Sequence, residues 1–116
     1  MVLQLQARVT DRSVVLITSP FIINELERVL ATKFGLTKQS AKSRTRLLAL
    51  VAEVVQPEKI ERISRDVNDD PILAAAVTGD AAYIVTLDDD LLALKEHRGI
   101  LIVVPAEFSE ASSSAA

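Results

Sequence analysis

The chain has 116 residues, of which 49% are hydrophobic, and it carries a net charge of −3 with no cysteine. This length and apolar content suit one domain with one buried core. The missing cysteines exclude disulfides and thiolate metal sites, and the acidic balance argues against a protein that coats nucleic acid by bulk positive charge. An aromatic content of 3% without Trp also argues against a surface that stacks bases.

Two further absences bear on location. The first eight residues lack the basic leader and continuous apolar block of a secretory signal. The longest apolar stretches, such as Ile100–Val104, are far shorter than the roughly 20 residues that a membrane span needs. We therefore expect a cytoplasmic protein that makes no contact with membranes.

Apolar strand patterns alternate with helical patterns along the chain. Val14–Ile17 is a β-branched run that predicts a strand, and Pro20 favours a helix start after it. The later predicted elements are a helix over Phe21–Leu30 that stops by Gly35, a helix from Thr37 to about Val51 with Leu47, Leu50 and Val51 pointing inward, a strand over Ala52–Val55, a helix from Asp69 to Gly79, a strand over Tyr83–Thr86, a helix over Asp89–Glu96 and a strand over Ile100–Val104. Ala52–Val55 could also extend the preceding helix, but we favour the strand.

Strands that are too apolar to face water, alternating with helices, predict an α/β fold with a mostly parallel sheet covered by helices. We expect residues 1–108 to form this domain. Ser109–Ala116 is rich in Ser and Ala and is expected to be a flexible tail.

Several carboxylates occupy positions where strands give way to helices. Asp88 and Asp90 follow the strand that ends at Thr86, Asp70 begins a helix, and Glu25 lies in the second turn of another helix. In open parallel sheets, such positions face the crevice outside the carboxyl ends of the strands. Clustered carboxylates repel one another unless a divalent cation neutralises them, and oxygen ligands suit Mg²⁺ or Mn²⁺. The pattern therefore predicts a metal site that hydrolyses a phosphodiester.

Each candidate also has a structural explanation. Asp70 and its neighbour Asp69 are good helix caps, the acids around Asp88 suit the first turn of a helix, and Glu25 can pair with Arg28 at i+3. One basic ridge is predicted on the helix that follows Thr37, where it is either a solvated face or a surface that holds a phosphate backbone. Its members recur at four-residue steps: Lys38, Lys42 and Arg46.

Four segments, in this order and spacing, resemble the PIN-domain nuclease family, and in particular its branch of toxin components of toxin–antitoxin systems. They are Ser19–Leu30, Asp69–Ala76, Ile84–Leu92 and Ile102–Phe108. The resemblance implies a metal-dependent endoribonuclease with a Rossmann-like, three-layer α/β/α fold and five parallel strands. It also implies Mg²⁺ or Mn²⁺ as cofactor, and RNA, an antitoxin protein and further copies of the chain as partners. In this resemblance Glu25, Asp70 and Asp88 match the acidic metal ligands, Asp90 is a further ligand, and Thr86 orients the site.

One departure from the family concerns its first motif. Family members open with a central strand that ends in Asp-Thr-Asn, and this sequence has no such motif; Asp11 is a poor substitute for its aspartate. We expect Val2–Ala7 to be the remainder of the first helix, so that the chain is truncated and its central strand is missing. The strands at Val14 and Tyr83 would then pair directly, or another chain would fill the gap.

Three functions follow as hypotheses. The first is the metal-dependent ribonuclease, and the alternative is a catalytically inactive PIN-like domain that acts through protein–protein interaction. The third is a receiver-like phosphoacceptor domain, which shares clustered aspartates on a doubly wound fold. A receiver needs an aspartate at the end of a central strand and a lysine after a later one, and the sequence shows neither.

Overall fold

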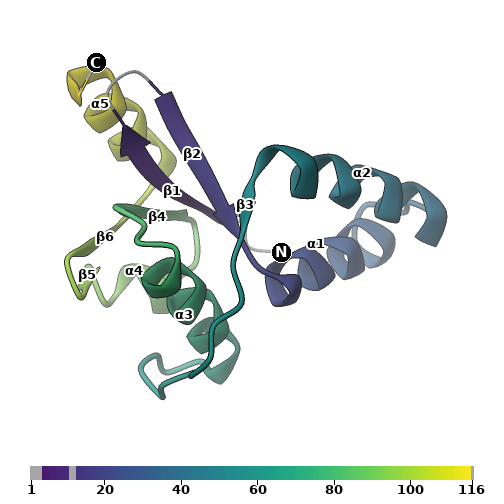
Figure 1. The fold of residues 1–116 in the computed structure, drawn as a ribbon. Helices are drawn as coiled ribbons and strands as arrows, with labels where there is room; N and C mark the ends of the chain where they lie inside the picture. Colours follow the sequence, from purple (N-terminus) through teal and green to yellow (C-terminus); the bar gives the residue numbers. More distant parts are fainter. Residues whose placement is uncertain (1–3, 11–12, 116) are drawn as a thin grey trace.

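A computed structural model of the protein describes residues 4–10 and 13–115, with side chains described for 14–110. Figure 1 shows the arrangement of the elements. In chain order they are β1 (Gln4–Thr10), β2 (Ser13–Thr18), α1 (Pro20–Thr32), α2 (Lys38–Val51), β3 (Glu53–Val54), the short 3₁₀ helix η1 (Val67–Asp69), α3 (Asp70–Thr78), β4 (Tyr83–Thr86), α4 (Asp89–Leu92), β5 (Glu96–His97), β6 (Ile100–Val103) and α5 (Pro105–Ala115).

The strands form one six-stranded sheet in the order β3-β2-β1-β4-β6-β5. Strand pairs β2/β3 and β4/β6 are parallel, whereas β1 runs antiparallel to both of its neighbours. Gln6 lies opposite Ile17 and Gln4 lies opposite Thr86, so the carboxyl ends of β2 and β4 meet at one edge of the sheet. The α/β class is confirmed, but the sheet is mixed and only partly parallel.

The central position of the sheet is filled by the chain's own first strand. The prediction that Val2–Ala7 is the remainder of a helix is wrong, because Gln4–Thr10 is strand β1. Val2, Leu3 and Asp11 lie outside the described residues. Neither direct pairing of β2 with β4 nor a second chain is needed, since β1 supplies hydrogen-bonding partners to both. Gln4–Thr10 alternates polar and apolar residues with the two-residue period of a strand. This alternation is the sequence signal that indicates β1.

The main core lies between α3 and one face of the sheet. Ile84 of β4 and Leu73 of α3 are almost fully buried there, together with Ile17 of β2. A Cβ added to Gly79, at the end of α3, would lie 2.5 Å from the Ile17 Cγ2 atom, so glycine allows α3 to approach β2. This contact sets the position of the helix whose first residues carry the candidate site.

The other face of β4 is covered by α5. Tyr83 points to the opposite side from Ile84, as neighbours in a strand do, and its ring meets Phe108 edge-on with centroids 5.4 Å apart. Helices therefore cover both faces of the sheet. Ser109–Ala115 continues α5 as helix where a flexible tail was expected.

Helices α1 and α2 form a hairpin that projects from the rest of the molecule (Figure 1). Thr37 caps α2 as expected, by accepting a hydrogen bond from Ser40 N at 3.1 Å. The expected inward position of three apolar residues on α2 is wrong: Leu47, Leu50 and Val51 are 65%, 81% and 73% exposed. The helix packs on α1 and not on the sheet, so its apolar stripe has no layer to bury it.

The helix after β4 is shorter than expected. Helix α4 ends at Leu92, Lys95 has a positive φ of 63°, and Glu96–His97 pairs with β6 as strand β5. None of the helices in the described part of the chain has both the length and the apolar character of a membrane span.

Candidate metal centre

Three aspartates converge near the start of α3 and α4. Asp66, Asp69 and Asp90 each offer a carboxylate oxygen, and these oxygens all lie within 4.8 Å of one another. Asp69 is buried at 6% exposure, while Asp66 and Asp90 are half-buried. We call these residues the acid triad. Its spacing fits a single divalent cation that takes one oxygen from each residue.

The residues before α3 hold two triad members in place. Asp66 caps η1, with its Oδ1 accepting a hydrogen bond from Asn68 N at 3.0 Å. The hydroxyl of Ser64 donates to Asp69 Oδ2 at 3.1 Å and accepts from Asp66 N at 3.3 Å. One buried hydroxyl thus joins both residues.

The turn after β4 brings a fourth carboxylate next to the triad. Asp88 caps α4 by accepting from Leu91 N at 3.1 Å, and its own N–H donates to Thr86 Oγ1 at 3.0 Å. Thr86 is fully buried at the end of β4, so it fixes the direction of the turn. The Asp88 carboxyl lies beside that of Asp69 and can form a hydrogen bond with it when one of the two is protonated. Asp90, two residues further on, completes the triad.

The crowding of carboxylates changes the acidity of Asp69. Burial is the largest cause, followed by the hydrogen bond and the negative charge of Asp88, and together with the charge of Asp66 they raise the pKa of Asp69 to about 7. Ser64 partly offsets this shift by donating to the carboxylate. A buried group that ionises reluctantly among other acids is a suitable partner for a divalent cation, whose charge would relieve the repulsion. The residues present therefore fit the metal that the sequence pattern predicts.

The carboxylate of Asp70, the neighbour of Asp69, faces the loop ahead of η1 and not the acid triad. Its Oδ1 accepts hydrogen bonds from Ile63 N at 3.0 Å and Ser64 N at 2.8 Å, and its Oδ2 pairs with Arg62 at 2.9 Å. Burial opposes ionisation of Asp70, but the two N–H donors and the Arg62 charge outweigh it and hold the pKa of this carboxyl below its ordinary value. Its metal role stays a prediction, since the acid triad does not include it.

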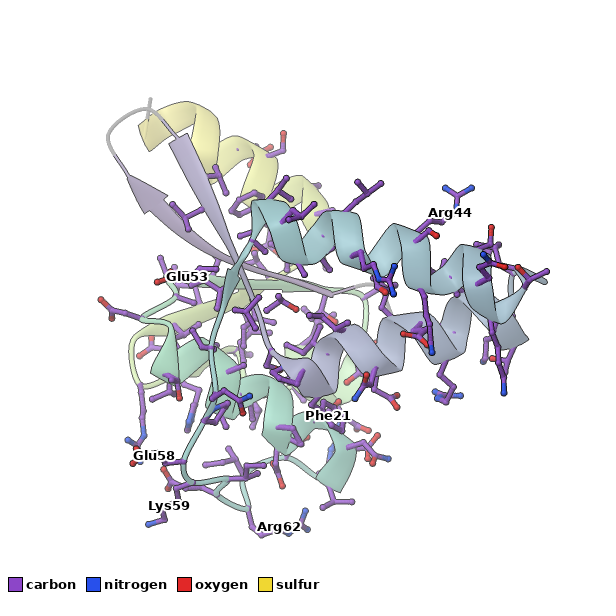
Figure 2. The ribbon with its side chains drawn as sticks, turned by 45° about the vertical axis from the view of Figure 1, so that its right-hand side comes forward. Phe21, Arg44, Glu53, Glu58, Lys59 and Arg62 are labelled. Atoms are coloured by element: carbon purple, nitrogen blue, oxygen red, sulfur yellow. The ribbon has the colours of Figure 1, made fainter. Side chains whose placement is uncertain are left out.

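The acid triad does not include the other predicted residues. Glu25 lies on α1 and pairs with Arg28 at 3.2 Å, which is the structural explanation given for it above. The ridge of Lys38, Lys42 and Arg46 is exposed on α2. Figure 2 shows Arg44 of the same helix well apart from Arg62 in the loop before η1. The roles of Glu25 and of this ridge stay predictions.

Sequence reasoning missed three residues of the centre. Asp66 and Asp69 stand at i and i+3, a spacing that places side chains together on one helical turn, and this was the signal that could have found them. Arg65 is the third: its guanidinium pairs with Asp90 Oδ1 at 2.9 Å although its side chain is 70% exposed. Nothing in the sequence pattern alone marks this pair.

Comparison with known proteins identifies the family. The family model described as PIN domain matches residues 3–90, a range that contains β1 and every acid of the centre. No curated protein and no solved structure shows a significant match to the chain. The family match and the acid triad agree in pointing to one chemistry, because PIN domains are generally nucleases that bind divalent metals. The chain belongs to the PIN domain family.

Proposed function

We propose that this protein is a divalent-cation-dependent ribonuclease that hydrolyses RNA phosphodiesters at the acid triad. The observation that carries the proposal is the convergence of Asp66, Asp69 and Asp90 within 4.8 Å, with the pKa of Asp69 raised to about 7 by burial and by the neighbouring acids. A bound Mg²⁺ or Mn²⁺ would supply charge neutralisation and activation of water for attack on phosphorus.

The protein's own residues hold the reacting groups. Asp69 offers a buried oxygen from the start of α3, and Asp66 and Asp90 offer oxygens from half-buried side chains. Asp88 and Thr86 fix the turn that carries Asp90. Arg65 stands beside Asp90 with an exposed guanidinium, a planar donor that suits a phosphate oxygen. This arrangement supports RNA binding along the loop before η1, close to the triad.

The first test is Mn²⁺ binding by calorimetry, followed by cleavage of a labelled RNA with and without the metal. We expect the parent chain to bind Mn²⁺ and Asp69→Asn to lose this binding. Asp89→Asn is the matched control, because Asp89 is exposed in the first turn of α4 and lies outside the triad. Equal affinity in the parent and Asp69→Asn would remove the triad from consideration as a metal site.

A second candidate function is binding without catalysis. The exposed stripe of Leu47, Leu50 and Val51 on α2 favours it, since apolar side chains at a helix surface suit contact with a second protein, either an antitoxin or another copy of the chain. The sequence of β1, Gln-Leu-Gln-Ala-Arg-Val-Thr, also places no carboxylate in the central strand. Mn²⁺ binding without RNA cleavage, together with a stable complex in light scattering, would favour this function over the nuclease.

A further inference from the structure

A loop ahead of η1 is fixed to the first residue of α3. Asp70 is 1% exposed, and its two oxygens accept from the backbone N–H groups of Ile63 and Ser64 and from the Arg62 side chain. Two backbone donors and one guanidinium use both oxygens of this carboxylate. The Asp70 side chain is therefore a main attachment of residues 62–64 of this loop.

The same loop reaches the acid triad through one hydroxyl. Ser64 is 4% exposed, its Oγ donates to Asp69 Oδ2, and the same Oγ accepts from the N–H of Asp66. A hydroxyl has one hydrogen to donate, and here that hydrogen orients a triad carboxylate. A continuous set of hydrogen bonds thus connects Asp70 to two of the three triad residues.

We propose that Asp70 is a positioning residue that acts on the metal centre through Ser64 and is not itself a ligand. This inference rests on the proposed function, because the centre in question is the acid triad. Three of the four acceptor sites of the Asp70 carboxylate are already used by Arg62 and the two backbone N–H groups, and the acid triad does not include this residue. Asp70 also lines a small separate pocket with Leu73 and His97, and the residues around that pocket do not include the triad.

The chemistry predicts how each change acts. Ser64→Ala removes the hydroxyl and frees Asp69 to rotate, whereas Ser64→Thr retains a hydroxyl at the same position. Asp70→Asn keeps the size of the side chain but replaces one acceptor oxygen by a donor, so the loop loses part of its attachment. Residues that orient metal ligands typically change metal affinity by about 10- to 100-fold when they are replaced.

The experiment is Mn²⁺ calorimetry on five variants, with thermal unfolding as a check on folding. The variants are Ser64→Ala, Ser64→Thr, Asp70→Asn, the double change Ser64→Ala with Asp70→Asn, and the control Ser43→Ala, whose hydroxyl bonds within α2. We expect the first and third variants to weaken Mn²⁺ affinity by about tenfold, the double variant to be no weaker than either of them, and the Thr variant and the control to match the parent. Hydrogen exchange at the amides of residues 63 and 64 should be faster in Asp70→Asn.

Several results would overturn the proposal. Complete loss of Mn²⁺ binding in Asp70→Asn, with Ser64→Ala at parent affinity, would make Asp70 a ligand. Additive losses in the double variant would show that Asp70 and Ser64 act independently. A Ser64→Thr variant as weak as Ser64→Ala would remove the hydroxyl from the explanation. If the parent chain binds no Mn²⁺, the proposed function fails as well, and this outcome is recognised from the parent alone.

Discussion

Replacing Asp69 by Asn should stabilise the metal-free protein at alkaline pH and leave its stability at low pH nearly unchanged. In the folded state burial and the adjoining Asp88 raise the pKa of Asp69 to about 7, while its ordinary value is 3.8. A carboxyl group whose pKa is higher in the folded state than in the unfolded state binds its proton more tightly in the folded state. Its favourable contribution to stability is therefore complete below pH 3.8 and is lost as the pH rises through 7.

The size of this effect follows from the two pKa values. Each pKa unit is worth about 1.36 kcal/mol, so ionised Asp69 costs at most about 4 kcal/mol of unfolding free energy at pH 8. Relaxation of the chain and of water around the charge reduces this figure, and we expect Asp69→Asn to gain about 2 kcal/mol. Asn resembles the protonated acid: its amide can donate to Asp88, and its oxygen can accept from Ser64.

The assay is urea unfolding of the parent and of Asp69→Asn from pH 3.5 to pH 8, in buffer with a metal chelator. The difference between their unfolding free energies should be near zero at pH 3.5 and grow to its full value at pH 8. Asp89→Asn, at an exposed position, should follow the parent at each pH. A constant difference across the range, or a variant that is less stable at pH 8, would refute the account of Asp69 as a buried acid under repulsion.

Four further substitutions, one of them a control, test other parts of the molecule. Arg65→Ala should tighten Mn²⁺ binding by about two- to fivefold in calorimetry at low salt, because the exposed guanidinium competes with a cation for Asp90; unchanged affinity would mean that the pair is easily displaced. Thr18→Val should raise the free energy of unfolding in urea by about 1 kcal/mol, since Thr18 Oγ1 is buried without a hydrogen-bond partner among the described residues. Thr45→Val, which loses a bond to the Lys42 carbonyl, should instead lower it. Glu25→Gln should leave Mn²⁺ affinity unchanged, and a large loss would bring Glu25 into the metal centre.

Local chemistry made much of the fold predictable. The Ser19-Pro20 pair begins α1, Thr37 caps α2 and Gly79 ends α3, each at the position that the sequence indicates. These signals act within a few residues, so they survive without knowledge of the tertiary structure. The exposed stripe on α2 shows the limit, because an apolar pattern reports which face could be buried and not whether another layer lies against it.

Strand β1 was not predicted, also because a sequence pattern does not report which elements lie next to a segment. Its alternating sequence predicts a strand, but the family resemblance led to a helical reading of the same residues. A family pattern assigns each segment a place and a direction. The family pattern does not show that a different segment, running antiparallel, can form the backbone hydrogen bonds that β2 and β4 need.

The sequence could not decide whether Asp69 or Asp70 belongs to the acid triad. Successive residues in a helix point about 100° apart, so two neighbouring aspartates at a helix start leave the backbone in different directions. Asp69 is the last residue of the 3₁₀ helix η1 and lies near Asp66, Asp88 and Asp90, whereas Asp70 bonds to the loop at Ile63. The path of the loop decides between them, and the loop has no periodic pattern to read.

The antiparallel direction of β1 limits what the central strand can give to this centre. At the edge where β2 and β4 end, β1 contributes its first paired residue, Gln4, opposite Thr86, and the strand holds no carboxylate along its length. The described acids of the centre therefore come from two short segments, at the starts of α3 and α4. A triad with one oxygen from each residue suits one cation. In the proposed metal centre, Ser64 and Asp70 would then matter more than in a site with a central-strand ligand, because the positions of the three carboxylates depend on the residues that hold them.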